Sequence, residues 1–214
     1  MRLAPVMNID HFMYAGPDLD RLCAGLQALT GIEPLPGGQH PQLGTHNRLA
    51  GSDTRLYLEL IGPDPSTSQG SPMRASIEAL PRPRLHRFIM DATGHDLGAV
   101  QAAYARAGIG CQVDDMHRLT PAGTTLRWRL LVPEANRYGL FAPFFIDWLD
   151  TPHPSTRLRA DFAMTDCEAG HPDRAELAAL WHELGVGITL HASDAPYLRV
   201  LLTTPRGPVA MASI

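Results

Sequence analysis

The chain has 214 residues, a 44% hydrophobic composition and a formal net charge of −4. This length fits one large or two small domains, and the apolar content is enough for a substantial core. The 18 basic residues are scattered along the chain, which argues against a nucleic-acid or anionic-membrane partner. The longest nearly apolar run, residues 139–146, is too short to span a bilayer.

The N-terminus and the cysteines bear on the compartment. Residues 1–12 pass directly into a strand-like pattern and lack the apolar core of a secretory signal. Cys23, Cys111 and Cys167 are odd in number and have no CxxC spacing, so they are expected to be small apolar fillers. Free thiols of this kind suit a reducing environment, and the sequence therefore predicts a cytoplasmic protein.

The first predicted unit, residues 1–63, begins with a strand at residues 7–14. A helix is predicted to follow with Asp18 as its N-cap and Gly31 as its C-terminal stop, because leucines recur between them at helical spacing. Extended segments are then predicted at residues 33–35, 45–49 and 55–61. The unit is therefore expected to run strand, helix and three strands.

The last strand of this unit contains an acid among apolar residues. Alternation places Tyr57, Glu59 and Ile61 on one face of the strand and leucines on the other. A carboxylate in such a setting has to be exposed in a cup, paired or bound to a metal, because unpaired burial is costly. The best upstream partner is His11, which lies in a similar apolar strand.

The same order of elements is predicted twice more. A linker rich in Pro and Ser, residues 64–84, leads to a second unit at residues 85–150 and a third βαβββ-like unit at residues 151–214. The third helix has Asp173 at its start and Glu176 three residues later, the pattern of a capping box. A spacing of 77 residues separates the glycines that end the three predicted helices, Gly31, Gly108 and Gly185. This spacing indicates an internal repeat.

A tandem βαβββ unit with a His on its first strand and an acid on its last resembles the vicinal oxygen chelate superfamily. Within it, the sequence is similar to the glyoxalase-like domain proteins. The first unit carries this similarity in GGQHP (37–41), GTHNRL (44–49) and YLELI (57–61). The second unit carries it in Arg118, Gly123, Trp128, PFFIDW (143–148) and His153-Pro154.

This resemblance implies an α+β fold in which two βαβββ modules form a U-shaped, partly open β-barrel cup. Ligands in the superfamily come from the first and fourth strands of each module. The third unit has no ligands at matching positions, and is expected to be a structural supplement or the surface of a homodimer.

Carried over to this chain, the resemblance makes His11 the first-strand ligand and Glu59 the fourth-strand ligand. Aligning Leu58-Glu59 with Ile146-Asp147 makes Asp147 the fourth-strand candidate of the second unit. The first-strand position of the second unit falls near Phe88, which is apolar, with His86 two residues earlier. His40 is expected to complete the ligand set from a loop.

Two imidazoles and a carboxylate suit a divalent metal ion such as Zn, Mn, Ni or Fe with open coordination positions. The ion would act as a Lewis acid on a small-molecule substrate. Glu59 and Asp147 are the candidate catalytic carboxylates, with Asp147 as a general base if it is not a ligand. The candidate substrate-binding residues are Thr45, Asn47, Arg118, Trp128, Phe145 and Trp148.

Plainer interpretations stand beside each of these. A single His in a strand is more often a core residue than a ligand, and Asp147 could simply hold the turn that follows it. Thr45 and Asn47 could satisfy the backbone of their own loop. Two functions remain open: a metal-dependent lyase, isomerase or dioxygenase acting on a small carbonyl or vicinal-oxygen compound, and a metal-free protein that binds or sequesters a small molecule.

Overall fold

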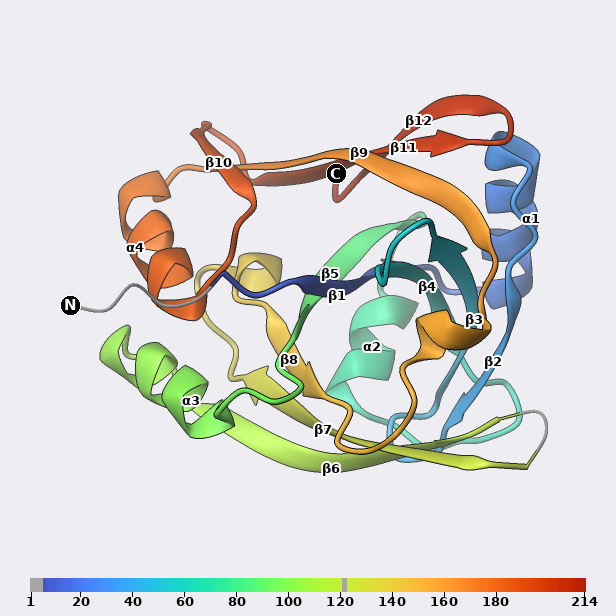
Figure 1. The fold of residues 1–214 in the computed structure, drawn as a ribbon, viewed down its shortest axis with the longest axis horizontal. Coiled ribbons are helices and arrows are strands. Elements are labelled where there is room, and N and C mark those ends of the chain that lie inside the picture. Colours follow the sequence, from blue (N-terminus) through green and yellow to red (C-terminus); the bar gives the residue numbers. More distant parts are fainter. Residues whose placement is uncertain (1–5, 121–122) are drawn as a thin grey trace.

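The computed structural model describes residues 6–120 and 123–214, and it has the α+β fold expected (Figure 1). The first unit contains β1 (Ile9–Ala15), α1 (Leu19–Thr30), β2 (Leu35–His40), β3 (Thr45–Ser52) and β4 (Tyr57–Pro63). The second contains β5 (Arg84–Asp91), α3 (Leu97–Arg106), β6 (Cys111–Leu119), β7 (Thr125–Pro133) and β8 (Phe144–Asp147). The third contains β9 (Ala160–His171), α4 (Arg174–Leu184), β10 (Thr189–Ala192), β11 (Tyr197–Thr204) and β12 (Gly207–Ala212).

The first two units have the same strand pairing. In each, the first strand pairs in parallel with the fourth, and the remaining strands follow antiparallel, giving the orders β1-β4-β3-β2 and β5-β8-β7-β6. The units join through a long antiparallel pairing of β1 with β5. On the other side, β2 and β6 meet at one pair, Gln39 with Leu119. The sheet is therefore a curled, partly open cup, which confirms the predicted architecture.

The third unit repeats the order of elements but not the pairing. β9 lies between β10 and β11, and it extends the sheet of the first unit through Gly51–Ala160 and Ser52–Phe162. Figure 1 shows β9 to β12 running together along the upper edge, away from β6 and β7. The third unit extends the sheet of the first unit, and it does not enclose the cup as the first two units do.

The helix ends follow the predicted signals with one exception. Asp18 caps α1 by accepting a hydrogen bond from the backbone of Arg21. Gly31, Gly108 and Gly185 all have positive φ, as helix-terminating glycines require (78°, 72° and 69°). At α4 the predicted capping-box hydrogen bond does not form.

Both acids expected in that capping box point to a cation from another unit. Arg137 Nη2 lies 2.6 Å from Glu176 Oε2, and Arg137 Nη1 lies 3.9 Å from Asp173 Oδ2. The carboxylates therefore bind a guanidinium instead of the first-turn amides of α4.

The segment expected to be a linker contains a short helix, α2 (Pro72–Glu78). Ser71 caps it and Pro72 occupies its first turn, a favourable start for a helix. Ile77 and Leu80 are buried against side chains from the inside of the cup. The segment therefore covers part of the cup's opening.

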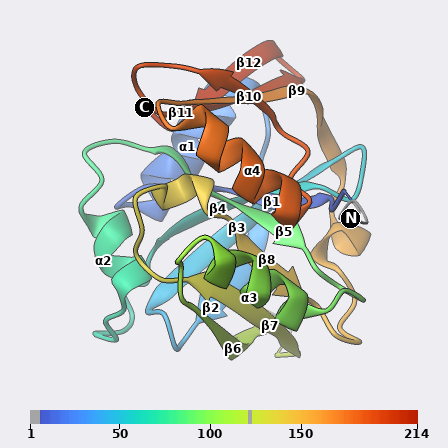
Figure 2. The ribbon, with the colours of Figure 1, turned by 90° about the vertical axis from the view of Figure 1, so that its left-hand side faces the viewer.

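The two faces of the curled sheet carry separate cores. Leu58, Leu60 and Phe88 pack on the outer face with the apolar sides of α1, α3 and α4. α3 and α4 lie next to each other (Figure 2), and an ion pair between Arg106 and Glu183 joins them. The inner face holds a second cluster of apolar side chains with the polar site. Among the described helices, none combines the length and apolarity that crossing a bilayer requires.

Candidate functional site

Three residues predicted as metal ligands meet on the inner face of the cup. His11 Nε2 lies 3.5 Å from Glu59 Oε2, and His40 Nε2 lies 3.9 Å from Glu59 Oε1. All three side chains are almost fully buried. β1 and β4 bring them together because Glu59 is the cross-strand partner of Met13, and alternation puts His11 on the same face as Met13.

His11 is oriented by a buried carboxylate that the sequence analysis missed. Asp10 Oδ1 lies 2.6 Å from His11 Nδ1. The other oxygen of Asp10 accepts a hydrogen bond from Trp148 Nε1 at 2.9 Å and lies 3.0 Å from His153 Nε2. Asp10 is only 1% exposed, so these contacts replace its water. An acid directly beside a candidate ligand in an apolar strand was the signal that could have found it.

The charges of the cluster follow from these contacts. Burial by itself would lower the pKa of His11, but hydrogen bonds to Asp10 and Glu59 outweigh it and raise that pKa to about 9. Burial opposes ionisation of Glu59, yet the contact with His11 lowers its pKa to about 2. Burial lowers the pKa of His40 to about 4. Glu59 is therefore ionised at neutral pH, and His40 is neutral.

Glu59 is also held from the side of the second unit. Asn47 Nδ2 donates to Glu59 Oε1 at 2.5 Å, and Arg118 Nη1 donates to Asn47 Oδ1 at 3.1 Å. Gly37 makes room for this chain, because a Cβ there would lie 2.0 Å from Asn47 Oδ1 and 2.9 Å from Arg118 Nη1. Asn47 and Arg118, expected to bind substrate, thus hold the carboxylate and also line the inner cavity.

His40 has an oxygen partner as well. Its Nδ1 lies 3.1 Å from the hydroxyl of Thr45, which leaves Nε2 directed toward Glu59. Thr45 is completely buried, so it contacts the imidazole and not the solvent. Its position suits orienting His40 better than contacting substrate.

Aromatic rings enclose the cluster. Trp128 and Trp148 lie 5.4 Å apart between ring centres, and the Trp128 ring meets His40 edge-on. Tyr57, which the sequence analysis did not assign, stacks on His11 at 4.6 Å. These rings line a small inner cavity of about 50 Å³. Trp128 and Trp148, predicted as substrate-binding residues, therefore line the inner side of the cup.

Two predicted site residues lie on the outer face of the sheet. Phe145 packs in the outer core against Tyr104, and Phe144 lines the cavity in its place. Asp147 forms an ion pair with Arg129 at 2.5 Å and accepts a hydrogen bond from the backbone of Leu149. The structure therefore does not bring Phe145 or Asp147 to the His11–Glu59 cluster.

Strand register explains this difference. His11 is paired directly with Ile89 across β1 and β5, and α1 and α3 each begin eight residues after these positions. Glu59 lies beside the residue two positions after His11, and Ile146 lies beside the residue two positions after Ile89. Ile146 is thus the equivalent of Glu59. The alignment with Asp147 was wrong by one residue, which reverses the face.

The donor set was tested against a divalent metal ion, which the superfamily implies. In the part of the chain that the structure describes, no three His, Cys, Asp or Glu side chains already have the spacing of metal ligands. His11, His40 and Glu59 would have to adjust from separations of 3.5 and 3.9 Å. Their chemistry nevertheless fits, because both Nε2 atoms face one carboxylate and both Nδ1 atoms have oxygen partners, as in histidine metal sites.

Comparison with known proteins assigns the family. The model of the glyoxalase-like domain (Glyoxalase_3) matches residues 9–185. This stretch is most of the chain, so the protein belongs to the glyoxalase-like domain family and has the fold of the vicinal oxygen chelate superfamily. A search of the curated proteins gave no match.

Solved structures similar to this chain were also found. A hypothetical protein from Staphylococcus aureus is 16% identical, covers 96% of this chain and 84% of its own, and has a TM-score of 0.62. A methylmalonyl-CoA epimerase from Mycobacterium tuberculosis is 14% identical over 71% of this chain and 94% of its own, with a TM-score of 0.46. A variant of the Streptomyces coelicolor epimerase is 19% identical over 70% and 99%, also with 0.46. The similarity to the first of these structures concerns the fold alone.

Proposed function

We propose that this protein is a metal-dependent enzyme, a lyase, isomerase or dioxygenase that acts on a small carbonyl or vicinal-oxygen compound. The observation that carries the proposal is the arrangement of His11, His40 and Glu59, in which two imidazole Nε2 atoms face one carboxylate. Asp10 and Thr45 hold the opposite ring nitrogens, which supports both histidines as oriented ligands.

The surrounding residues have defined tasks in such an enzyme. A divalent ion held by His11, His40 and Glu59 would supply Lewis-acid chemistry to an oxygen of the substrate. Asn47 fixes the orientation of Glu59 and is itself fixed by Arg118. The tryptophan rings exclude water from the cluster, which strengthens every electrostatic interaction inside it.

A second function is favoured by one specific observation. The second unit carries Ile89 and Ile146 at the positions equivalent to His11 and Glu59, so half of the usual ligand set is apolar. Asn47 also satisfies Glu59 through a direct hydrogen bond. Both features support a metal-free protein that binds a small molecule in the same cup.

Elemental analysis of protein purified without chelator separates the two functions. We expect close to one divalent ion per chain in the wild type and in Glu33→Gln, since Glu33 is exposed and does not line the inner cavity. Glu59→Gln should lose the ion, because the neutral amide is a poor ligand. Wild-type protein that is folded and free of metal would contradict the enzyme and favour the binding protein.

A further inference from the structure

A larger cavity lies directly outside the candidate site. It has a volume of about 380 Å³, within the range of small-molecule pockets. Side chains shared by both cavities join it to the inner one: Leu43, Met73, Met116, Leu130 and Phe144. All five are apolar, so a ligand that reaches His11 and Glu59 from here passes between hydrocarbon and aromatic groups.

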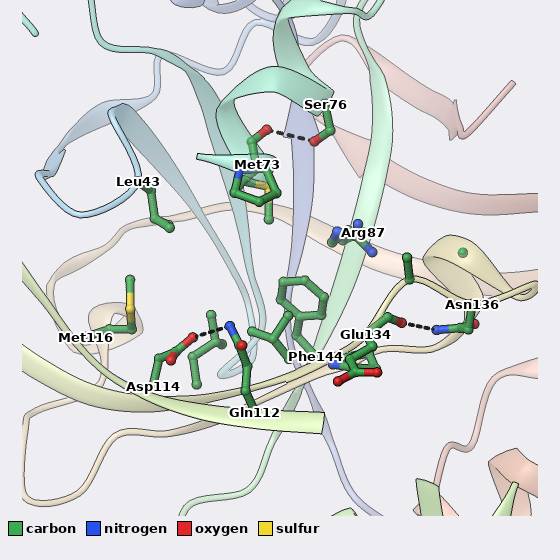
Figure 3. A pocket seen from close by; sticks show the side chains of 16 residues that line it. Leu43, Met73, Ser76, Arg87, Gln112, Asp114, Met116, Glu134, Asn136 and Phe144 are labelled. Carbon is green, nitrogen blue, oxygen red and sulfur yellow. Dashed lines mark hydrogen bonds between the residues drawn. The ribbon is translucent and has the colours of Figure 1, made fainter. Parts of the chain in front are cut away.

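One cation, Arg87 of β5, lines this cavity. Its guanidinium carbon lies 4.5 Å from the centre of the Phe144 ring. Residues of a strand alternate between its two faces, and in β5 Phe88 and Met90 pack in the outer core whereas Ile89 packs in the inner cluster. Arg87 is thereby left on the cavity side. Figure 3 shows it above the Phe144 ring, with Met73 of α2 on one side and Gln112 of β6 on the other.

Arg87 has no hydrogen-bond or ion-pair partner among the residues that the structure describes. Its Nε is buried without a hydrogen bond, and no carboxylate of the described residues forms an ion pair with it. Apart from the Phe144 ring, a partly buried guanidinium in this state loses hydration without gaining a hydrogen bond or an ion pair in return. Its fork of N–H donors matches a carboxylate well. The missing partner is therefore expected to be an anionic group that arrives with the ligand.

Two acids define how much negative charge the cavity accepts. Asp114 and Glu134 lie on the wall opposite α2, and Gln112 donates to Asp114 at 3.0 Å (Figure 3). Glu134 is exposed to solvent, whereas Arg87 is partly buried. A ligand with several negative charges along its length would be repelled by these acids. A ligand with one anionic group at Arg87 and an apolar body would not.

We propose that the outer cavity binds the carboxylate of a mostly apolar monocarboxylate, with Arg87 as its ion-pair partner. The proposal deepens the proposed function, because it assigns the substrate class of the same cup and rests on that function for its catalytic meaning. The apolar part of the ligand then lies against Phe144, Met73 and Met116. The end of the ligand away from the carboxylate is directed toward His11 and Glu59.

Matched ligands of equal length test the proposal. Octanoate, octanamide and octylamine share an eight-carbon chain and carry a negative, a neutral and a positive head group, and a change in tryptophan fluorescence reports their binding near Trp128 and Trp148. The wild type should bind octanoate about tenfold or more tightly than octanamide, the factor that one charge-assisted hydrogen bond supports. It should bind octylamine most weakly. Equal binding of octanoate and octanamide would overturn the proposal without any variant.

Variants locate the preference at Arg87. Arg87→Met replaces the cation by an apolar side chain of similar length. The variant should bind octanoate and octanamide equally, with an affinity for octanamide unchanged from the wild type. Arg127→Met is the matched control, because Arg127 is exposed and its neighbours Leu126 and Trp128 face the inner core. An undiminished octanoate preference in Arg87→Met would assign the carboxylate to another group and contradict the proposal.

The same titrations separate this inference from the proposed function. They are repeated in the Glu59→Gln background after treatment with chelator, so octanoate cannot bind a metal ion there. A preference for octanoate there, combined with metal-free wild-type protein, would support carboxylate binding at Arg87 and contradict the proposed metal-dependent enzyme. Stoichiometric metal in the wild type without any preference for octanoate would support the metal-dependent enzyme and contradict carboxylate binding at Arg87.

Discussion

The two halves of the cup share a topology but treat inward-facing polar groups differently. In the first unit, Asp10, His11 and Glu59 are buried and each has several partners in the protein. In the second, the positions equivalent to His11 and Glu59 are isoleucines, and Arg87 nearby has no hydrogen-bond or ion-pair partner among the described residues. The duplicated scaffold therefore combines one half that builds a polar cluster with another half that provides an apolar wall and the Arg87 cation at the outer cavity.

The largest effect is expected from Asp10, at the centre of the polar half. Asp10→Asn replaces an acceptor of three contacts by a group that cannot accept from all of them. We expect a loss of about 3–5 kcal/mol in the free energy of unfolding, as for other broken buried pairs. Urea denaturation measures it. Asp20→Asn is the control, because Asp20 is exposed and pairs only with the partly exposed Arg48, so a loss of similar size there would contradict this account.

Gly37 tests the link between the halves. Gly37→Ala places a methyl group in the space occupied by Asn47 and Arg118, and we expect it to cost about 1–3 kcal/mol of stability. The displaced Asn47 should also weaken metal binding. Gly25→Ala is the matched control, since nothing lies within 4 Å of the added carbon in α1, and it should stabilise the protein slightly. Thermal melts measure the stability of both variants and calorimetric titration measures their metal affinity. Equal values for Gly37→Ala and Gly25→Ala would contradict this prediction.

The first strand of the second unit predicts a pH effect. Burial, followed by Arg87 and Arg84, lowers the pKa of His86 to about 4 from a usual 6.5. The unfolded chain therefore takes up a proton as pH falls below 6.5, whereas the folded state does so only near pH 4. Stability should fall by about 2 kcal/mol or less between pH 7 and pH 5 on this account.

Substitution isolates that contribution. His86→Gln should flatten the dependence of unfolding free energy on pH in this window, while His95→Gln, at an exposed position, should not. Identical slopes for the wild type and His86→Gln would show that His86 is not kept neutral by its surroundings.

The smallest effect on stability is expected at Arg87. Arg87→Met removes a cation that the described protein leaves unpaired, so the free energy of unfolding should stay within about 1 kcal/mol of the wild type or rise. A large loss on urea denaturation would mean that Arg87 is a structural residue. The contrast with Asp10→Asn is the direct expression of the difference between the two halves.

Much of the fold followed from local signals. Asp18 and the three helix-ending glycines marked helix boundaries correctly, because caps act through the nearest backbone groups. Alternation in β4 correctly placed Glu59 opposite its neighbouring leucines, since only one face of that strand meets the cavity. The pairing of β9 with β3 and β11 depends on distant contacts, and no local pattern specifies it.

The candidate site was predictable only in its first half. His11, His40 and Glu59 lie together as the family resemblance implied, although their role stays a prediction. β8 is buried on both faces, so its apolar pattern has no period that fixes the register, and Asp147 was placed one residue away from the true equivalent of Glu59. Arg87 was missed because Phe88, one residue before the true equivalent Ile89, was taken as the inward-facing position of β5.

The most direct test of the central claim is anomalous diffraction from crystals grown with manganese or zinc. We predict one strong anomalous peak between His11 Nε2, His40 Nε2 and the Glu59 carboxylate, at bond lengths near 2.0–2.2 Å for zinc. A well-ordered crystal in which Glu59 stays bonded to Asn47 and His11, with no anomalous peak in the cup, would contradict it.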